Sequence, residues 1–435
     1  MTIYVVKPGD TLYSIARENA ITPELITYIN GIEDPESLTV GQALIILRPS
    51  VVYMVRENDT LSQIALKYGV SLNQLYRNNP ILGGRDNITP GQILIIEYDT
   101  EKRGTISTGG YAYPYIDRDV LRKTLPYLTY LTIFGYGMNE DGTLVPIDDS
   151  EIIEITRSYG TSPVMLLSSL GVDGRFSNNL VSTVLNNPAA RGTLINSIVQ
   201  TMLAKRYDAV DVDFEYVLPE DKEIFIQFIN ELRAASNARG KQVFIALAPK
   251  TSADQRGLLY EAHDYGALGE AANKVLLMTY EWGYTYGPPM AVAPINMVER
   301  VVNYALTEIP ADKIFMGIPN YAYDWQLPYV SGESRATSIS NTAAVTLAGD
   351  TGSEIMFDET AQTPFFVYTD DMGNKHEVWF EDARSILAKL NLVLDKNLFG
   401  AAVWQVMRYF QQLWMVINAN TNIRRTGDEA LTNIF

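Results

Sequence analysis

The chain has 435 residues, of which 47% are hydrophobic, enough for a sizeable core and for more than one domain. Its formal net charge is −17 and it has no long basic run, which argues against nucleic acid and anionic membrane surfaces as partners. With no cysteine and only two histidines, it has no means of forming a disulfide framework and little material for a zinc site or a Ser-His-Asp triad.

The N-terminus carries no recognisable targeting segment. Residues 1–4 lead directly into folded-looking sequence, so we expect no signal peptide. No apolar run approaches the roughly 20 residues that a membrane span requires, so we also expect no membrane span. Any export would then use another route, such as deposition onto a structure assembled inside the producing cell. We expect a monomer.

The first hundred residues contain an internal duplication. Residues 5–16 align with 54–65, and residues 39–46 align with 89–96. Each unit is typical of strand, helix, helix, strand, which predicts two small domains at 1–48 and 51–97 and a short polar linker at 98–104. We therefore expect both units to lie close to the rest of the chain rather than on a long tether.

Both units share the pattern D-T-L-x-x-I-A, an asparagine before a loop and a G-Q-x-L-x-I end. The Asp-Thr pair is placed to cap the first helix, and capping alone is an alternative role for the two aspartates. These units resemble LysM modules, which bind N-acetylglucosamine residues of peptidoglycan and chitin; the other interpretation is an inert spacer. The resemblance implies two glycan-binding grooves, formed by Gly9, Asp10, Thr11, Leu12 and Asn30 in the first unit and by Asp59, Thr60, Leu61 and Asn79 in the second.

From residue 105 onward, short β-branched runs alternate with helical stretches, as a parallel α/β fold requires. The predicted strands are 106–112, 130–134, 164–168, 209–216, 242–248, 274–280, 314–319 and 399–405. This series predicts a (β/α)8 TIM barrel over residues 105–435, whose chemistry would lie at the C-terminal strand ends.

The fourth predicted strand alternates apolar and acidic residues. Period 2 places Asp211, Asp213 and Glu215 on one face, with Val210, Val212, Phe214 and Tyr216 on the other. Three adjacent carboxylates away from water raise one another's pKa, which is costly for a structural role and useful for acid–base catalysis. Calcium or magnesium binding is the alternative, but a D-x-D-x-D-G loop needs a glycine that is missing here, so we expect no metal and no cofactor.

The segment D-V-D-F-E at 211–215 resembles the D-x-D-x-E motif on the fourth strand of glycoside hydrolase family 18, the chitinase family. Ala209 and Phe214 replace the usual glycine and tryptophan, and the third strand lacks the usual S-x-G-G. The resemblance implies that Glu215 is the general acid and that the 2-acetamido group of the substrate attacks, forming an oxazolinium ion with retention of configuration. Asp213 would hold the acetamido N–H, and Asp211 would support Asp213.

Further strand ends match the same family. Met278-Thr279-Tyr280-Glu281 resembles its M-x-Y-D segment, so Tyr280 would orient the acetamido oxygen, with Met278 and Glu281 beside it; Glu281 replaces the usual aspartate. Asn320 or Tyr321 would line the cleft after the seventh strand. Trp404 would form the floor under the cleaved sugar. For each aromatic residue, core packing is the alternative.

A stretch at about 324–380 interrupts the barrel pattern and contains two strand-like runs, 365–368 and 377–380. It resembles the small α+β insertion that deepens the cleft in some members of the family. His376 lies within it, on what we expect to be a polar turn in contact with solvent.

The two LysM-like units, the missing signal peptide and the barrel together resemble the spore-germination N-acetylglucosaminidases of endospore-forming bacilli, the cortical fragment-lytic group. The resemblance implies cleavage after N-acetylglucosamine in spore cortex peptidoglycan, which carries muramic-δ-lactam, and a location in the coat or cortex region of the spore. A LysM-anchored chitinase and a non-catalytic glycan-binding protein on the same barrel are the alternatives.

Overall fold

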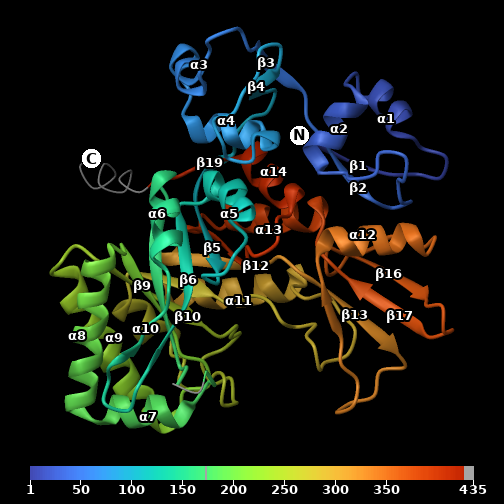
Figure 1. Ribbon diagram of the computed structural model, residues 1–435. Coiled ribbons are helices and arrows are strands. Elements are labelled where there is room, and N and C mark those ends of the chain that lie inside the picture. The colour runs from blue at the N-terminus through green and yellow to red at the C-terminus, as the bar shows by residue number, and fades with distance from the viewer. Residues whose placement is uncertain (172–173, 426–435) are drawn as a thin grey trace.

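The computed structural model describes residues 1–171 and 174–425 and shows two small N-terminal modules, a barrel and a lateral insertion (Figure 1). The modules pack together at one end of the barrel, and the insertion projects from its side. In the part of the chain that is described, no helix is both long and apolar enough to cross a membrane.

Each N-terminal module has the predicted order of strand, helix, helix, strand. The first consists of β1 (Thr2–Val5), α1 (Leu12–Glu18), α2 (Pro23–Asn30) and β2 (Ala43–Ile46). The second consists of β3 (Pro49–Met54), α3 (Leu61–Tyr68), α4 (Leu72–Asn78) and β4 (Ile93–Tyr98), with a short 3-10 turn at Pro80–Leu82. Strand β3 begins two residues before the predicted start of this module, so only a short connection separates the modules.

Threonines, not aspartates, cap the first helix of each module. The Thr11 side chain accepts a hydrogen bond from the Ser14 N–H, and the Thr60 side chain accepts one from the Gln63 N–H. Asp10 instead closes the preceding turn, because its Oδ2 accepts hydrogen bonds from the Lys7 N–H at 2.7 Å and from the Tyr4 hydroxyl at 2.9 Å. The predicted capping role of the aspartates is therefore wrong, and the threonines alone fill it.

Eight parallel strands of the described residues close into the predicted barrel, with β5 paired to both β6 and β18. They are β5 (Gly104–Ala112), β6 (Tyr130–Met138), β8 (Ser162–Ser168), β9 (Ala209–Asp213), β10 (Gln242–Leu247), β11 (Lys274–Leu277), β12 (Ile314–Pro319) and β18 (Gly400–Trp404). All eight predicted strands are present. However, β9 and β11 end three residues earlier than predicted, so Glu215 and Tyr280 lie in the segments that follow the strands.

Helices surround the strands and bury their apolar faces against them, and large side chains fill the barrel interior. The helices are α5 (Arg118–Thr124), α6 (Ser150–Ser158), α7 (Asn178–Asn186), α8 (Pro188–Lys205), α9 (Lys222–Asn237), α10 (Tyr265–Ala271), α11 (Ile295–Glu308), α13 (Ala383–Asp395) and α14 (Gln411–Asn420). Two short strands extend the sheet: β7 (Leu144–Val145) pairs with β6, and β19 (Thr421–Ile423) pairs with β5.

The insertion after β12 is an antiparallel sheet with one helix, as predicted. Its elements are β13 (Ala322–Leu327), β14 (Thr337–Ile339), α12 (Asn341–Asp350), β15 (Met356–Asp358), β16 (Thr363–Thr369) and β17 (Lys375–Trp379). His376 is a correction: it lies within β17, its Nδ1 is 2.8 Å from Asp324 Oδ1, and its ring stacks on Tyr368. Sheet pairing places this side chain between neighbours rather than in solvent.

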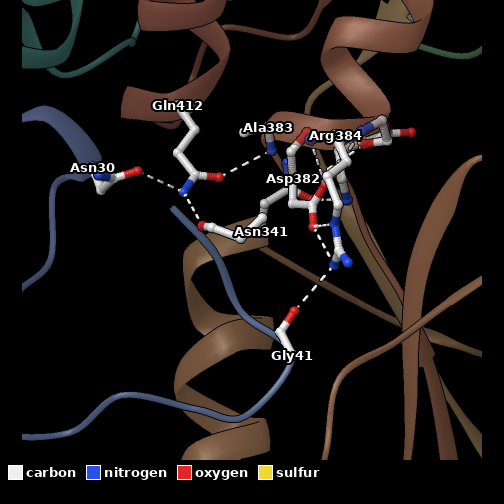
Figure 2. Close-up of polar contacts among 10 residues, drawn as sticks. Asn30, Gly41, Asn341, Asp382, Ala383, Arg384 and Gln412 are labelled. Atoms are coloured by element: carbon white, nitrogen blue, oxygen red, sulfur yellow. Dashed lines mark hydrogen bonds and ion pairs between the residues drawn. The ribbon is translucent and has the colours of Figure 1, made fainter. Parts of the chain in front are cut away.

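The modules are joined to the barrel by polar contacts along α14 and at the start of α13 (Figure 2). Gln412 Nε2 donates to Asn30 Oδ1 at 3.0 Å and to the Ala43 carbonyl at 2.7 Å. Arg384, at the start of α13, donates to the Gly41 carbonyl at 3.1 Å. Six residues further along α14, Asn418 donates to Asn78 Oδ1 of the second module at 2.9 Å. The modules thus lie against the barrel, as the short linkers predicted.

Candidate active site

Three carboxylates lie at the C-terminal end of β9. Asp211 is buried inside the barrel and its Oδ2 accepts a hydrogen bond from the Tyr111 hydroxyl at 2.6 Å. In the described residues, Asp211 Oδ1 and Asp213 Oδ1 are buried without a hydrogen-bond partner. Buried carboxylate oxygens without partners are costly, which points to a functional rather than a structural reason for them.

The surroundings favour the protonated form of all three acids. Burial raises the pKa of Asp211 to about 6, and the hydrogen bond from Tyr111 partly opposes this shift. Burial, Glu215 and Asp211 raise the pKa of Asp213, whereas burial and the charge of Glu281 raise the pKa of Glu215. The group therefore holds a proton at a pH where an ordinary carboxylate would have lost it.

The turn after β9 departs from the predicted strand. Phe214 is fully buried, and its ring lies 5.9 Å from those of Phe225 and Phe228 on α9. Tyr216 was expected on the same apolar face, but it adopts φ 57° and is 48% exposed. The strand ends at Asp213, so the period of 2 no longer holds and the tyrosine reaches solvent.

Tyr280 and Glu281 follow β11. Tyr280 is buried, and its pKa is raised by burial and by the charges of Asp213 and Glu215, which places its hydroxyl near the acids. Glu281 has φ 67° and accepts hydrogen bonds from the hydroxyls of Tyr321 and Tyr323. The predicted cleft residue Tyr321 thus reaches this group through its hydroxyl, and Tyr323 was missed by the sequence analysis.

Asn320 has a different environment from the one expected. It is 4% exposed, and its Nδ2 donates to the carbonyls of Gln405 at 3.1 Å and Arg408 at 2.9 Å. These bonds join the ends of β12 and β18. Because its amide group is engaged within the protein, the structure argues against the predicted substrate contact.

Aromatic rings form a connected cluster around Trp404, which ends β18. The Trp404 ring lies 5.5 Å from Tyr111 and 5.9 Å from Phe134. Tyr113 stacks on Tyr115 at 5.3 Å, and Tyr115 is 75% exposed. Met278 packs against the same interior cluster. The sequence analysis missed Tyr111, Tyr113 and Tyr115, although their Y-x-Y-x-Y spacing across the end of a predicted strand could have indicated them.

A cavity of about 320 Å³ opens beside Tyr280 and Glu281. It is lined by Tyr280, Glu281 and Trp282 from the segment after β11, and by residues of the segment after β10, including Thr251 and Ser252. Within residues 1–171 and 174–425, no cluster of three or more histidine or acidic side chains is arranged to hold a metal ion.

The structure separates the predicted LysM groove residues into two groups. Asn30 and Asn79 are buried: Asn30 donates to the carbonyls of Ile26 and Ile45, and Asn79 makes the equivalent pair of bonds. These amides join the second helix to the last strand, which argues against direct glycan contact.

Gly9, Asp10, Asp59 and Thr60 lie in the loops before α1 and α3 and reach solvent. Leu12 and Leu61 begin these two helices and lie in the module cores. Thr11, Leu12 and Asn79 line a groove of about 1040 Å³ between the two modules.

Comparison with known proteins identifies both parts of the chain. Residues 99–408 match the model of the glycosyl hydrolases family 18, and residues 4–47 and 53–97 match that of the LysM domain. The cortical fragment-lytic enzyme of Bacillus subtilis (strain 168) is 41% identical over 431 residues, covering 97% of this chain and 99% of that protein.

Solved structures agree. The spore cortex-lytic enzyme SleL of Bacillus megaterium QM B1551 superposes with a TM-score of 0.82 at 37% identity, over 97% of this chain and 98% of the other. A chitinase from Chromobacterium violaceum has a TM-score of 0.68 at 23% identity, over 72% of this chain and 98% of the other, and shares the fold.

Proposed function

The chain belongs to glycosyl hydrolase family 18, and from this premise we propose that it hydrolyses spore cortex peptidoglycan after N-acetylglucosamine. The observation that carries the proposal is the series Asp211, Asp213 and Glu215, in which the buried Asp211 is linked through Tyr111 to the ring of Trp404. The full-length similarity to the cortical fragment-lytic enzyme supports cortex as the substrate, including its muramic-δ-lactam. It also supports action during germination and location in the coat or cortex region of a spore.

Glu215 is the general acid in this proposal. Its raised pKa keeps a proton available for the glycosidic oxygen, and cleavage of that bond leaves positive charge at the anomeric carbon. The substrate's 2-acetamido oxygen then bonds to that carbon and forms an oxazolinium ion. Glu215, now a carboxylate, takes a proton from water. The water oxygen attacks the anomeric carbon on the face opposite the acetamido oxygen and opens the oxazolinium ring, so the anomeric configuration is retained.

Neighbouring residues orient the acetamido group. Asp213 is partly exposed, so its carboxyl group can accept the acetamido N–H and offset the charge of the oxazolinium ion. Asp211, which Tyr111 holds, supports Asp213 electrostatically, and Tyr280 directs its hydroxyl toward the acetamido oxygen. Trp404 supplies the floor under the sugar, with Met278 beside it, and Glu281 with its tyrosines forms the adjacent wall.

The two LysM domains hold the polymer in this proposal. A peptidoglycan strand, or a related N-acetylglucosamine polymer, is the expected partner, because both domains lie on the same molecule as the cleft. No cofactor or metal is required by the mechanism, since the acid and the substrate's own acetamido group supply the chemistry.

The test compares wild type with Glu215→Gln and with Glu223→Gln, an exposed control on α9. Products from purified cortex fragments and from chitin oligomers are identified by mass spectrometry, and the first anomer is identified by NMR. We expect wild type and control to release cortex fragments ending in N-acetylglucosamine, initially as the β anomer. We expect Glu215→Gln to lose about 10²–10⁴-fold in rate.

Two results would count against this function. Cleavage of chitin oligomers with cortex left intact would favour a LysM-anchored chitinase. Near wild-type turnover by Glu215→Gln would remove Glu215 from its role, and turnover by neither protein would favour a glycan-binding role.

A further inference from the structure

His263 connects the ends of two barrel strands near the acids. It lies just before α10 and is 1% exposed. Its Nδ1 accepts a hydrogen bond from the Ala248 N–H at 2.9 Å, and its Nε2 is 3.1 Å from the Phe214 carbonyl oxygen. Because Nδ1 is occupied as an acceptor, the neutral ring carries its proton on Nε2 and donates it to Phe214.

The imidazole ring takes the place of a missing backbone pairing. Strands β9 and β10 pair directly from Ala209 with Gln242 to Val212 with Ile245, and the register then ends. Beyond that point the Phe214 carbonyl and the Ala248 N–H would be left without a protein partner in the barrel wall. One side chain that offers one donor and one acceptor satisfies both groups.

Further hydrogen bonds hold His263 and the segment that follows β10. Lys250 Nζ donates to the His263 carbonyl at 3.0 Å. The Tyr265 hydroxyl donates to the Ala248 carbonyl at 2.6 Å and accepts from the Lys250 N–H at 2.9 Å. The ring of His263 also lies 6.2 Å from that of Phe225 on α9, so the ring has little freedom to move.

We propose that His263 is a positioning residue for Glu215, acting through its hydrogen bond to the Phe214 carbonyl. This carbonyl belongs to the peptide unit that leads directly into Glu215, and the next residue, Tyr216, has a left-handed φ of 57°. The imidazole therefore fixes the backbone just before Glu215, and the chain turns just after it, at Tyr216. The proposal rests on the assignment of Glu215 as the acid.

The neutral ring, and with it the bond to Phe214, persists as the pH falls toward about 4. Burial, together with the nearby Lys250 ammonium, lowers the pKa of His263 to about 4. Protonation would place a second N–H opposite the Ala248 N–H, so the buried site favours the neutral ring. A change in the pH profile of a His263 variant would therefore report on Glu215 rather than on the imidazole.

Two amide variants separate positioning from folding. A glutamine amide reaches the place of Nε2 and can keep the bond to Phe214, whereas an asparagine amide reaches only the place of Nδ1 and keeps the bond to Ala248. Each variant loses one buried hydrogen bond of the pair. We expect His263→Asn to lower kcat about 10–100-fold with little change in KM, because small displacements of a catalytic group have such effects, and His263→Gln to retain more activity.

The measurement uses purified cortex fragments as substrate, with thermal melting to correct for the folded fraction. His376→Gln, at the only other histidine of the chain, serves as the matched control and should keep wild-type kcat. With only two histidines, nitrogen-detected NMR should also show the Nε2–H tautomer of His263 directly.

Equal kcat for the Asn and Gln variants after correction, or a ring protonated on Nδ1, would overturn the positioning role. Loss of activity in Glu215→Gln is measured separately, so failure of the acid assignment is distinguishable from failure of this inference.

Discussion

At the scale of single residues, the cost of burying the acids sets the chemistry. Asp211 is 1% exposed and accepts a hydrogen bond from Tyr111, and its second oxygen has no partner in the described residues. Its pKa of about 6 in the folded protein exceeds the ordinary value of 3.8. An acid whose pKa is raised on folding makes the folded state less stable once it ionises.

We expect Asp211→Asn to be less active but more stable at neutral pH. Below about pH 4, Asp211 keeps its proton in both the folded and the unfolded wild-type protein, so the variant has little advantage in stability there. As pH rises toward about 6, wild type loses stability relative to the variant, and the difference levels off at on the order of 3 kcal/mol. Urea denaturation from pH 4 to pH 7 measures it, with exposed Asp371→Asn as the control. A difference independent of pH would contradict this origin.

At the scale of secondary-structure elements, α14 joins the two N-terminal modules to the barrel. Its residues from Gln411 to Ala419 are all buried. Apolar side chains face the barrel core, whereas the amides of Gln412 and Asn418 face the two modules. A helix buried on every side cannot be amphipathic in the usual sense, and its polar residues need partners from elsewhere in the chain.

We expect Gln412→Ala to lower the free energy of unfolding by about 1–3 kcal/mol, because the Ala43 carbonyl and the Ala383 N–H would lose their buried partner. Chemical denaturation measures the loss. Gln200→Ala, on the exposed side of α8, is the matched control and should change stability little. Equal effects in the two variants would show that the Gln412 contacts drawn in Figure 2 contribute nothing measurable.

At the scale of the whole molecule, the modules are part of one folded body. Ile29, Ile45 and Leu47 of the first module share a continuous apolar core with the barrel. Arg77 of the second module donates to the Pro126 carbonyl at 2.9 Å, at the end of the barrel where β6 begins. This end is opposite the one that carries the acids, so a glycan held by the second module would have to pass along the side of the barrel to reach them.

We expect a single unfolding transition in calorimetry, because the modules and the barrel share this core. Ile15 lies only in the core of the first module, so Ile15→Ala should shift the whole transition by about 2–5 kcal/mol. Val367→Ala, at an exposed position in the insertion, provides the control. A separate low-temperature transition in the Ile15 variant would show that the module unfolds on its own.

Much of the architecture is encoded locally. The duplicated D-T-L-x-x-I-A pattern predicted both modules, and β-branched runs predicted the barrel strands in order. The alternation predicted that Asp211 and Asp213 lie on one face of β9, because side-chain direction along a strand depends only on position, whereas Glu215 lies beyond the end of that strand. These inferences succeeded because residues close in sequence decide which helices and strands form.

The rest depended on residues far apart in the chain. Tyr111 and Asp211 are 100 residues apart, and His263 meets Phe214 across 49. Asn30 looked like a ligand-binding residue until the structure placed Ile45 against its amide, with Gln412 of α14 on its oxygen. The sequence alone determined which chemical groups this protein has and on which elements they lie. Only the tertiary structure decided which of them are engaged with one another and which remain free, because buried polar groups find partners through packing that no local pattern records.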